Sequence, residues 1–195
     1  MEYRQLNLQK TLQSVLKVSV SNSSNSYDLV VLGAGPGGYT AAFRASDLGK
    51  KVLMIDKDTN IGGVCLNRGC IPSKSLLHIA KVTNEVESLS RMGFSYANKD
   101  INLDRLRSWK NSVIKKFNIG LKSMSESRNI SFISGEAKFI SNSSIEVDTD
   151  GIISKIEFTN IIIATGSRST ALPNAPNSNL IWSSKDALEL NSIPS

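Results

Sequence analysis

Short apolar runs alternate with amphipathic stretches along most of the chain. Residues 28–32 (DLVVL) and 51–55 (KVLMI) are apolar runs, and between them a glycine-rich turn opens a helical stretch that closes at Gly49. Apolar runs of this length, bounded by turn residues, are typical of buried strands. The pattern therefore predicts a strand, a helix and a second strand, the unit from which parallel α/β sheets are built.

The remaining pattern predicts two more helices and then several short strands. Residues 74–91 favour a helix, and the next helix carries an apolar stripe at Leu103, Leu106, Val113, Ile114, Phe117, Leu121 and Met124. We expect a short strand over 130–133, three strand-like runs within 137–158 broken at 141–144 and at Asp150-Gly151, and a buried strand over 160–163. A short helix is expected near Asp186. The fold class is α/β, with a parallel sheet and an inserted three-stranded antiparallel β-meander.

Composition and charge exclude several functions. The chain has 195 residues, 40% of them hydrophobic, which suits one domain. Of its net charge of +6, much comes from residues 99–128, where eight basic side chains face three acidic ones. Because most of these cations lie off the apolar stripe, we interpret them as a solvated helix face and expect no nucleic-acid partner. No apolar run approaches the roughly 18 residues of a membrane span, so we expect no membrane association.

Residues 1–26 differ from the rest. A weak amphipathic pattern is followed by the polar run SNSSNS, which indicates a tail and linker. Lys17 interrupts the apolar stretch, so a secretory signal is not expected. An organelle transit peptide is the alternative, although Glu2 and the single Arg4 do not favour it. We therefore expect a cytoplasmic protein rather than one of the mitochondrial matrix.

A glycine fingerprint, G-x-G-x-x-G, lies between the first strand and the first helix at Gly33, Gly35 and Gly38. The first glycine permits a tight turn, the second lets the backbone approach a pyrophosphate, and the third lets the helix pack on the sheet. Asp56 ends the second predicted strand, 23 residues after Gly33, where its carboxylate can accept hydrogen bonds from a ribose. The motif predicts dinucleotide binding.

Cys65 and Cys70 are the chain's two cysteines, and His78 is its single histidine. These are too few for a secreted disulfide scaffold or a tetrahedral zinc site, so no metal is expected and a redox pair is favoured. Residues five apart on a regular helix point in different directions, so a disulfide requires a distorted turn, which Gly69 and Pro72 can supply. At a helix start, the dipole is expected to lower a thiol's pKa.

The run GGVCLNRGCIPSK at 62–74, placed between the fingerprint and the ATGS segment at 164–167, resembles the disulfide-containing FAD reductases. Within them it is most similar to the dihydrolipoamide dehydrogenases, over residues 28–195. Glutathione and trypanothione reductases usually have Lys where Ser73 stands. Mercuric reductase keeps both cysteines and remains an alternative, but Leu66-Asn67 and 76–78 look more like the lipoamide enzymes.

The resemblance implies a Rossmann-like FAD-binding domain that oxidises dihydrolipoyl groups through a Cys65–Cys70 disulfide and FAD to NAD. It implies that Cys65 exchanges with the substrate, that Cys70 lies nearer the flavin, and that Lys74 approaches the flavin. Asp56 replaces the usual Glu, which shortens the reach of the acid. His78 is expected to be structural. The residues expected to bind the cofactor are Gly33, Gly35, Gly38, Asp56, Lys57, Gly62, Gly63, Val64, Cys65, Lys74, Ala137, Thr165 and Gly166.

The resemblance also sets the expected organisation. Residues 27–167 would form the FAD-binding domain and 168–195 a connection toward an NAD-binding domain, while the central and dimerisation domains of such reductases are not found in this sequence. We expect the N-terminal part of an enzyme, not competent alone. In the complete enzyme the expected partners are a second subunit and the lipoyl domains of 2-oxoacid dehydrogenase or glycine-cleavage complexes. A non-catalytic FAD-binding fragment is the alternative.

Overall fold

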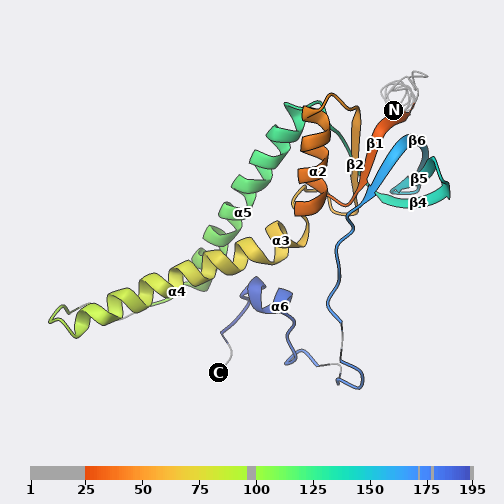
Figure 1. Ribbon diagram of the computed structural model, residues 1–195. Coiled ribbons are helices and arrows are strands. Elements are labelled where there is room, and N and C mark those ends of the chain that lie inside the picture. The colour runs from red at the N-terminus through yellow and green to blue at the C-terminus, as the bar shows by residue number, and fades with distance from the viewer. Residues whose placement is uncertain (1–24, 96–99, 171, 177, 194–195) are drawn as a thin grey trace, which may run out of the picture.

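A computed structural model describes residues 25–95, 100–170, 172–176 and 178–193, so most of the expected tail over 1–26 lies outside the described residues. One mixed sheet of six strands forms the centre, in the order β3-β2-β1-β6-β5-β4 (Figure 1). The elements in chain order are β1 (Ser26–Leu32), α2 (Pro36–Asp47), β2 (Val52–Asp56), α3 (Gly63–Arg68), α4 (Cys70–Ser90), α5 (Leu103–Glu126), β3 (Ser131–Ser134), β4 (Glu136–Ser141), β5 (Ser144–Thr149), β6 (Ile152–Ile163) and α6 (Ser184–Glu189).

Four strands, β3, β2, β1 and β6, run parallel. Strand β1 pairs with β2 on one side, where Leu29 lies opposite Val52, and with β6 on the other, where Leu32 lies opposite Ile163. Strand β2 pairs with β3 on its outer side. The chain moves from β1 outward through β2 to β3 and then returns to β6 on the opposite side of β1. The strand order thus reverses beside β1, and in open parallel sheets ligands bind at the carboxyl ends of the strands at such a point.

Strand β6 is longer than the sequence pattern predicts. Its first half pairs antiparallel with β5, and its second half pairs parallel with β1, without interruption. The meander and the predicted strand over 160–163 are therefore joined in one element, and separating them was wrong. The buried character expected for 160–163 was also wrong at Ile162 and Ile163, which are 39% and 64% exposed, because α2 packs mainly over β1 and β2.

The core has two parts, one on each face of the sheet. Leu29 and Val31 point to the face covered by α2 and pack with Phe43 and Met54. Val30 and Leu32 point to the other face and pack with side chains of the meander, including Ile145 and Ile156. Because neighbouring side chains of a strand alternate between faces, β1 is buried on both sides, which makes it a rigid base for the loop that follows it.

Helices α2 to α5 lie on one side of β1 and β2, the hairpin of β4 and β5 lies on the other, and α6 lies apart from these helices (Figure 1). Helix α4 begins at Cys70, four residues earlier than predicted, because Pro72 lies in the first turn, where its missing N–H is not needed. In α5 the expectation of a solvated basic face was wrong at Lys110. That side chain is 3% exposed, and its Nζ donates a hydrogen bond to the carbonyl of Leu188 at 2.5 Å.

Candidate functional site

The fingerprint loop connects β1 to α2, and close backbone contacts account for two of its glycines. Gly33 has φ of +99°, and a Cβ there would lie 2.2 Å from the carbonyl oxygen of Ala164. A Cβ on Gly38 would lie 1.8 Å from the carbonyl oxygen of Gly33. At Gly35, by contrast, the nearest atom to such a Cβ is the Gly63 Cα at 3.9 Å. Its backbone is therefore open to approach at the start of α2.

The second glycine pair, Gly62 and Gly63, lies directly against this loop. The Gly62 N–H donates a hydrogen bond to the carbonyl of Ala34 at 2.8 Å. A Cβ on Gly63 would lie 2.7 Å from the Cα of Gly35, and both Gly62 and Gly63 have positive φ, at +125° and +58°. A side chain on Gly63 would force the two loops apart, whereas one on Gly62 would meet the side chain of Leu66 in α3. The fold thus brings together two predicted glycine motifs that are about 28 residues apart in the sequence.

Asp56, at the end of β2, is half-buried beside the fingerprint. Its Oδ2 accepts a hydrogen bond from the Ala34 N–H at 2.6 Å, and its Oδ1 accepts one from the Asp58 N–H at 2.9 Å. A carboxylate has about four acceptor positions, so capacity remains for a diol. The carboxylate of Asp56, which is shorter than the expected Glu, is thus held by two backbone N–H groups of its own chain.

A cavity of about 780 Å³ opens at the carboxyl ends of β1 and β2, beside the loop after β6. Six of the residues predicted from the sequence line it: Gly33, Asp56, Lys57, Val64, Ala137 and Thr165. The other predicted residues do not line it: Gly35, Gly38, Gly62, Gly63, Cys65, Cys70, Lys74 and Gly166. Ion pairing shapes its wall, since Lys57 Nζ lies 2.8 Å from Glu136 Oε1.

The charged residues of this cavity that were not predicted from the sequence are Asp58, Arg68, Glu136, Arg168 and Lys185. Arg68 holds Asp58 through two hydrogen bonds, of 3.1 and 2.6 Å, and this contact raises the pKa of the guanidinium. The sequence contains a signal for Arg68, because this basic residue of the cysteine motif follows the acidic Asp58 by only ten residues. Glu136 and Lys185 are too distant in sequence for such a signal.

The two cysteines lie on different helices, Cys65 within α3 and Cys70 at the first residue of α4. Gly69 separates the helices with φ of −137° and ψ of −98°, and a Cβ there would lie 3.1 Å from the Val64 carbonyl oxygen. The distortion expected between the cysteines is thus a break at Gly69. Both side chains are half-buried and are free thiols in contact with each other.

The lowering of a thiol pKa that is expected at a helix start is not found at Cys65. The hydrogen bond with Cys70 is the main cause that raises the pKa of the Cys65 thiol above its ordinary value, and burial raises it further. The positive charge of Lys74 opposes this rise. Cys65 lies inside the short helix α3 and not at the first residue of α4, so the stabilisation expected at a helix start does not dominate there. Lys74 and His78 are both exposed on α4.

No helix in the described part of the chain combines the length and hydrophobicity needed to cross a bilayer. Nor, within those same residues, do three or more His, Cys, Asp or Glu side chains gather where they could hold a metal ion. The described residues place a thiol pair near a glycine-rich loop and near a polar cavity, at the edge of the sheet where the strand order reverses.

Comparison with known proteins gives this arrangement a family. Residues 27–194 match the model of the pyridine nucleotide-disulphide oxidoreductases, so the chain belongs to that family. The α/β fold class and the resemblance carried by the cysteine motif are thereby confirmed.

More particularly, proteins named dihydrolipoyl dehydrogenase are similar to this chain. It is 44% identical over 168 residues to one from Buchnera aphidicola subsp. Schizaphis graminum and 44% identical over 167 residues to one from Vibrio cholerae. One from Staphylococcus aureus is 39% identical over 167 residues. These alignments cover 85 to 86% of this chain but 35 to 36% of the relatives, so the chain spans about a third of their length.

Proposed function

We propose that this chain provides the flavin-binding and dithiol part of an oxidoreductase of the dihydrolipoyl dehydrogenase type. The observation that carries the proposal is the contact between Cys65 and Cys70 on two helices, one of which begins where the Gly62-Gly63 pair meets the fingerprint. In this proposal residues 27–167 form the FAD-binding domain, and 168–195 lead toward an NAD-binding domain.

The residues present fit FAD. Gly35 leaves open backbone at the start of α2, whose first N–H groups favour a pyrophosphate. Asp56 and the neighbouring Lys57 line the cavity where a ribose would be held, and Ala137 and Thr165 line the same cavity. Gly38, Gly62, Gly63 and Gly166 would shape the loops around the cofactor. FAD, when bound, supplies a carrier that accepts two electrons.

The exchange with substrate starts from the oxidised form of the cysteine pair, the Cys65–Cys70 disulfide. A thiolate of a dithiol substrate attacks Cys65 Sγ, the Cys65–Cys70 bond breaks, and Cys70 takes the leaving electron pair. The second substrate thiolate then attacks the substrate sulfur of the mixed disulfide, closing the substrate disulfide and releasing Cys65. Two electrons and two protons pass from the substrate to the pair. Lys74 would stabilise negative charge near these sulfurs, since its charge already favours the Cys65 thiolate.

The activity of the whole protein is part of the same proposal. The relatives are named for dihydrolipoyl dehydrogenation, and this chain would take part in that reaction with NAD as final acceptor. Lipoyl domains of 2-oxoacid dehydrogenase or glycine-cleavage complexes would present the dithiol, and a homodimer in the cytoplasm would be the working form. Membranes and nucleic acids have no role in it.

Flavin binding is tested by two matched glycine variants of the 195-residue chain. Gly35→Ala places a methyl group on the open backbone without a clash in the chain itself. Gly37→Ala is the control, because its Cβ meets no atom within 4 Å. We expect Gly35→Ala to weaken FAD binding about tenfold or more, or about 1.4 kcal/mol, because the methyl group obstructs the approach of the pyrophosphate to the backbone. Gly37→Ala should bind as the unmodified chain does. Titration by flavin fluorescence measures both, and equal affinities, or no saturable binding by the unmodified chain, would contradict the proposal.

A further inference from the structure

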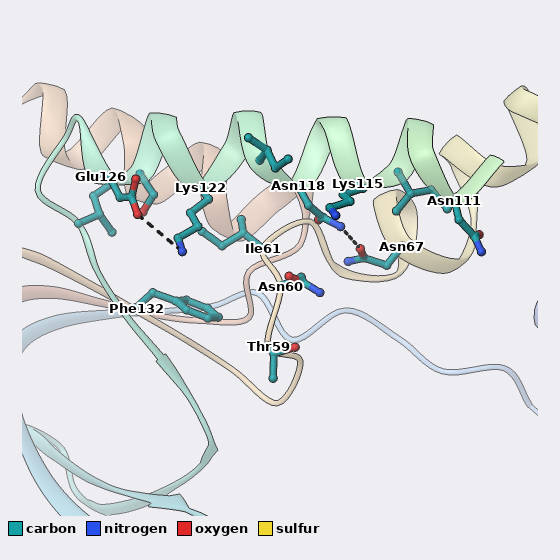
Figure 2. A pocket seen from close by; sticks show the side chains of 14 residues that line it. Thr59, Asn60, Ile61, Asn67, Asn111, Lys115, Asn118, Lys122, Glu126 and Phe132 are labelled. Carbon is teal, nitrogen blue, oxygen red and sulfur yellow. Dashed lines mark hydrogen bonds and ion pairs between the residues drawn. The ribbon is translucent and has the colours of Figure 1, made fainter. Parts of the chain in front are cut away.

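Helix α3 carries Cys65 and is tied to α5 by a chain of two amide hydrogen bonds. Asn118 Nδ2, on α5, donates to Asn67 Oδ1 at 3.0 Å, and Asn67 Nδ2 donates to the Gly63 carbonyl oxygen at 3.0 Å. Figure 2 shows Asn118 and Asn67 pointing toward one another from the two helices. Gly63 and Asn67 lie two residues on either side of Cys65, so the chain of bonds spans the position of the thiol.

The neighbouring helix gives this link its importance. Cys70 begins α4, and α5 packs against both α3 and α4. The two cysteines are separated by the break at Gly69, where the backbone could otherwise change the angle between α3 and α4. A side chain that fixes α3 to α5 therefore fixes the position of Cys65 relative to Cys70.

The amide oxygen of Asn118, Oδ1, is also unusual, because it is buried and has no hydrogen-bond partner among the described residues. Leaving a buried acceptor unpaired is unfavourable, and native proteins rarely do so without a use for the group. The same cavity of about 810 Å³ is lined by polar side chains, such as Asn60 and Lys115, and by apolar ones, such as Ile61.

We propose that Asn118 is a positioning residue for the thiol pair, which acts through Asn67 and holds Cys65 beside Cys70. The inference rests on the proposed dithiol function and names a further residue for it. By ordering the two sulfurs before they react, the bond lowers the entropy lost when the disulfide closes. Its removal therefore makes the Cys65–Cys70 disulfide easier to reduce.

The test is the thiol–disulfide equilibrium of the full 195-residue chain in mixtures of reduced and oxidised glutathione. Glutathione disulfide takes the two electrons from the pair, and alkylation followed by mass spectrometry counts the remaining thiols. Asn118→Leu keeps the approximate shape of the side chain and removes both amide groups. Asn111→Leu is the matched control, because Asn111 lines the same cavity from α5 two turns earlier (Figure 2).

For Asn118→Leu we expect the equilibrium constant for disulfide formation to fall about three- to tenfold, the factor that one amide hydrogen bond contributes. Asn111→Leu should stay within about twofold of the unmodified chain, a change below half of one such bond. Asn118→Leu removes the donor to Asn67 Oδ1, so some loss of stability is expected, and urea unfolding of the reduced variants shows that both are folded under the conditions of the redox titration. An unchanged equilibrium constant, or the same fall in both variants, would overturn the inference while leaving the dithiol function in place.

A second variant tests the same bond from its other partner. Asn67→Ala should lower the equilibrium constant as Asn118→Leu does, and the double variant should fall no further, because both changes break one chain of bonds. Additive falls would overturn the link through Asn67. Should Asn118→Leu not fold, Asn67→Ala alone decides the matter by the same comparison with Asn111→Leu. If the unmodified chain forms no Cys65–Cys70 disulfide, the proposed function and this inference both fail.

Discussion

Gly37 and Gly38 are neighbours in the first turn of α2, and replacing each by alanine should change stability in opposite directions. A Cβ on Gly38 would lie 1.8 Å from the backbone oxygen of Gly33, whereas real Cβ contacts are essentially never under 3.0 Å. The start of α2 would therefore have to move by at least about 1.2 Å away from the fingerprint loop. A Cβ on Gly37 meets no atom within 4 Å.

The expected magnitudes follow from these contacts. Forcing a methyl group into a packed backbone site costs about 1–3 kcal/mol, and Gly38→Ala should reach the upper part of this range because the opposing atom is backbone rather than a side chain. Gly37→Ala should raise the free energy of unfolding by about 0.4–1 kcal/mol, since alanine restricts the unfolded chain more than glycine does. The two variants should thus differ by about 3 kcal/mol, a large share of the stability of a typical domain.

Urea unfolding followed by circular dichroism measures both variants against the unmodified chain. Equal slopes of free energy against urea concentration would show that the comparison is one of stability alone. The reasoning is refuted if Gly38→Ala unfolds at the same urea concentration as the unmodified chain, or if Gly37→Ala is the less stable of the two. Either result would mean that the loop and the helix do not meet as closely as the Gly33–Gly38 contact requires.

Two further predictions concern pH. Because Cys70 is the main cause of the raised pKa of Cys65, Cys70→Ala should move the pH profile of Cys65 alkylation to lower pH than in the reduced, unmodified chain. Iodoacetamide rates over a series of pH values measure this profile, and an unmoved profile contradicts the prediction. Burial lowers the pKa of Lys110 in the folded chain below the ordinary value of 10.5, which applies to the unfolded chain. Between the folded and the unfolded pKa the unfolded chain binds more protons, so stability rises with pH in that range. Lys110→Met should remove that rise, measured by urea unfolding at a series of pH values, with the exposed Lys122→Met expected to keep it.

The strands and the fingerprint could be predicted because their signals are local. An apolar run ending in Gly33 and an acid at the end of the next run define the loop whatever the rest of the chain does. The continuity of β6 could not be predicted in this way. The predicted runs 137–158 and 160–163 left a boundary at Thr159, yet the pairing of β6 with β1 continues across it, from Phe158 with Tyr27 to Asn160 with Leu29. Pairing with β1 keeps this polar stretch in the strand.

Residues of the candidate site could be grouped from the sequence where one segment carries several of them, and could not where distant segments meet. Cys65, Cys70 and Lys74 stand within one short run, and the structure keeps them close together. The burial of Lys110 depends on the carbonyl of Leu188, which lies 78 residues further along the chain. The pKa of Cys65 likewise depends on how two helices meet at Gly69, which the spacing of the cysteines does not determine.

Strand β6 belongs to both halves of the sheet, and this affects how the protein loses its structure. Its antiparallel pairing with β5 and its parallel pairing with β1 overlap, because Glu157 has partners on both sides. Local opening of the meander therefore removes the pairing of residues 152–157, in the same strand whose other end, at Ile163, adjoins the contact between Ala164 and Gly33. The antiparallel and parallel parts of the sheet should behave as one cooperative unit, so that the loop which approaches the cofactor is as resistant to opening as the meander that lies far from it in the sequence.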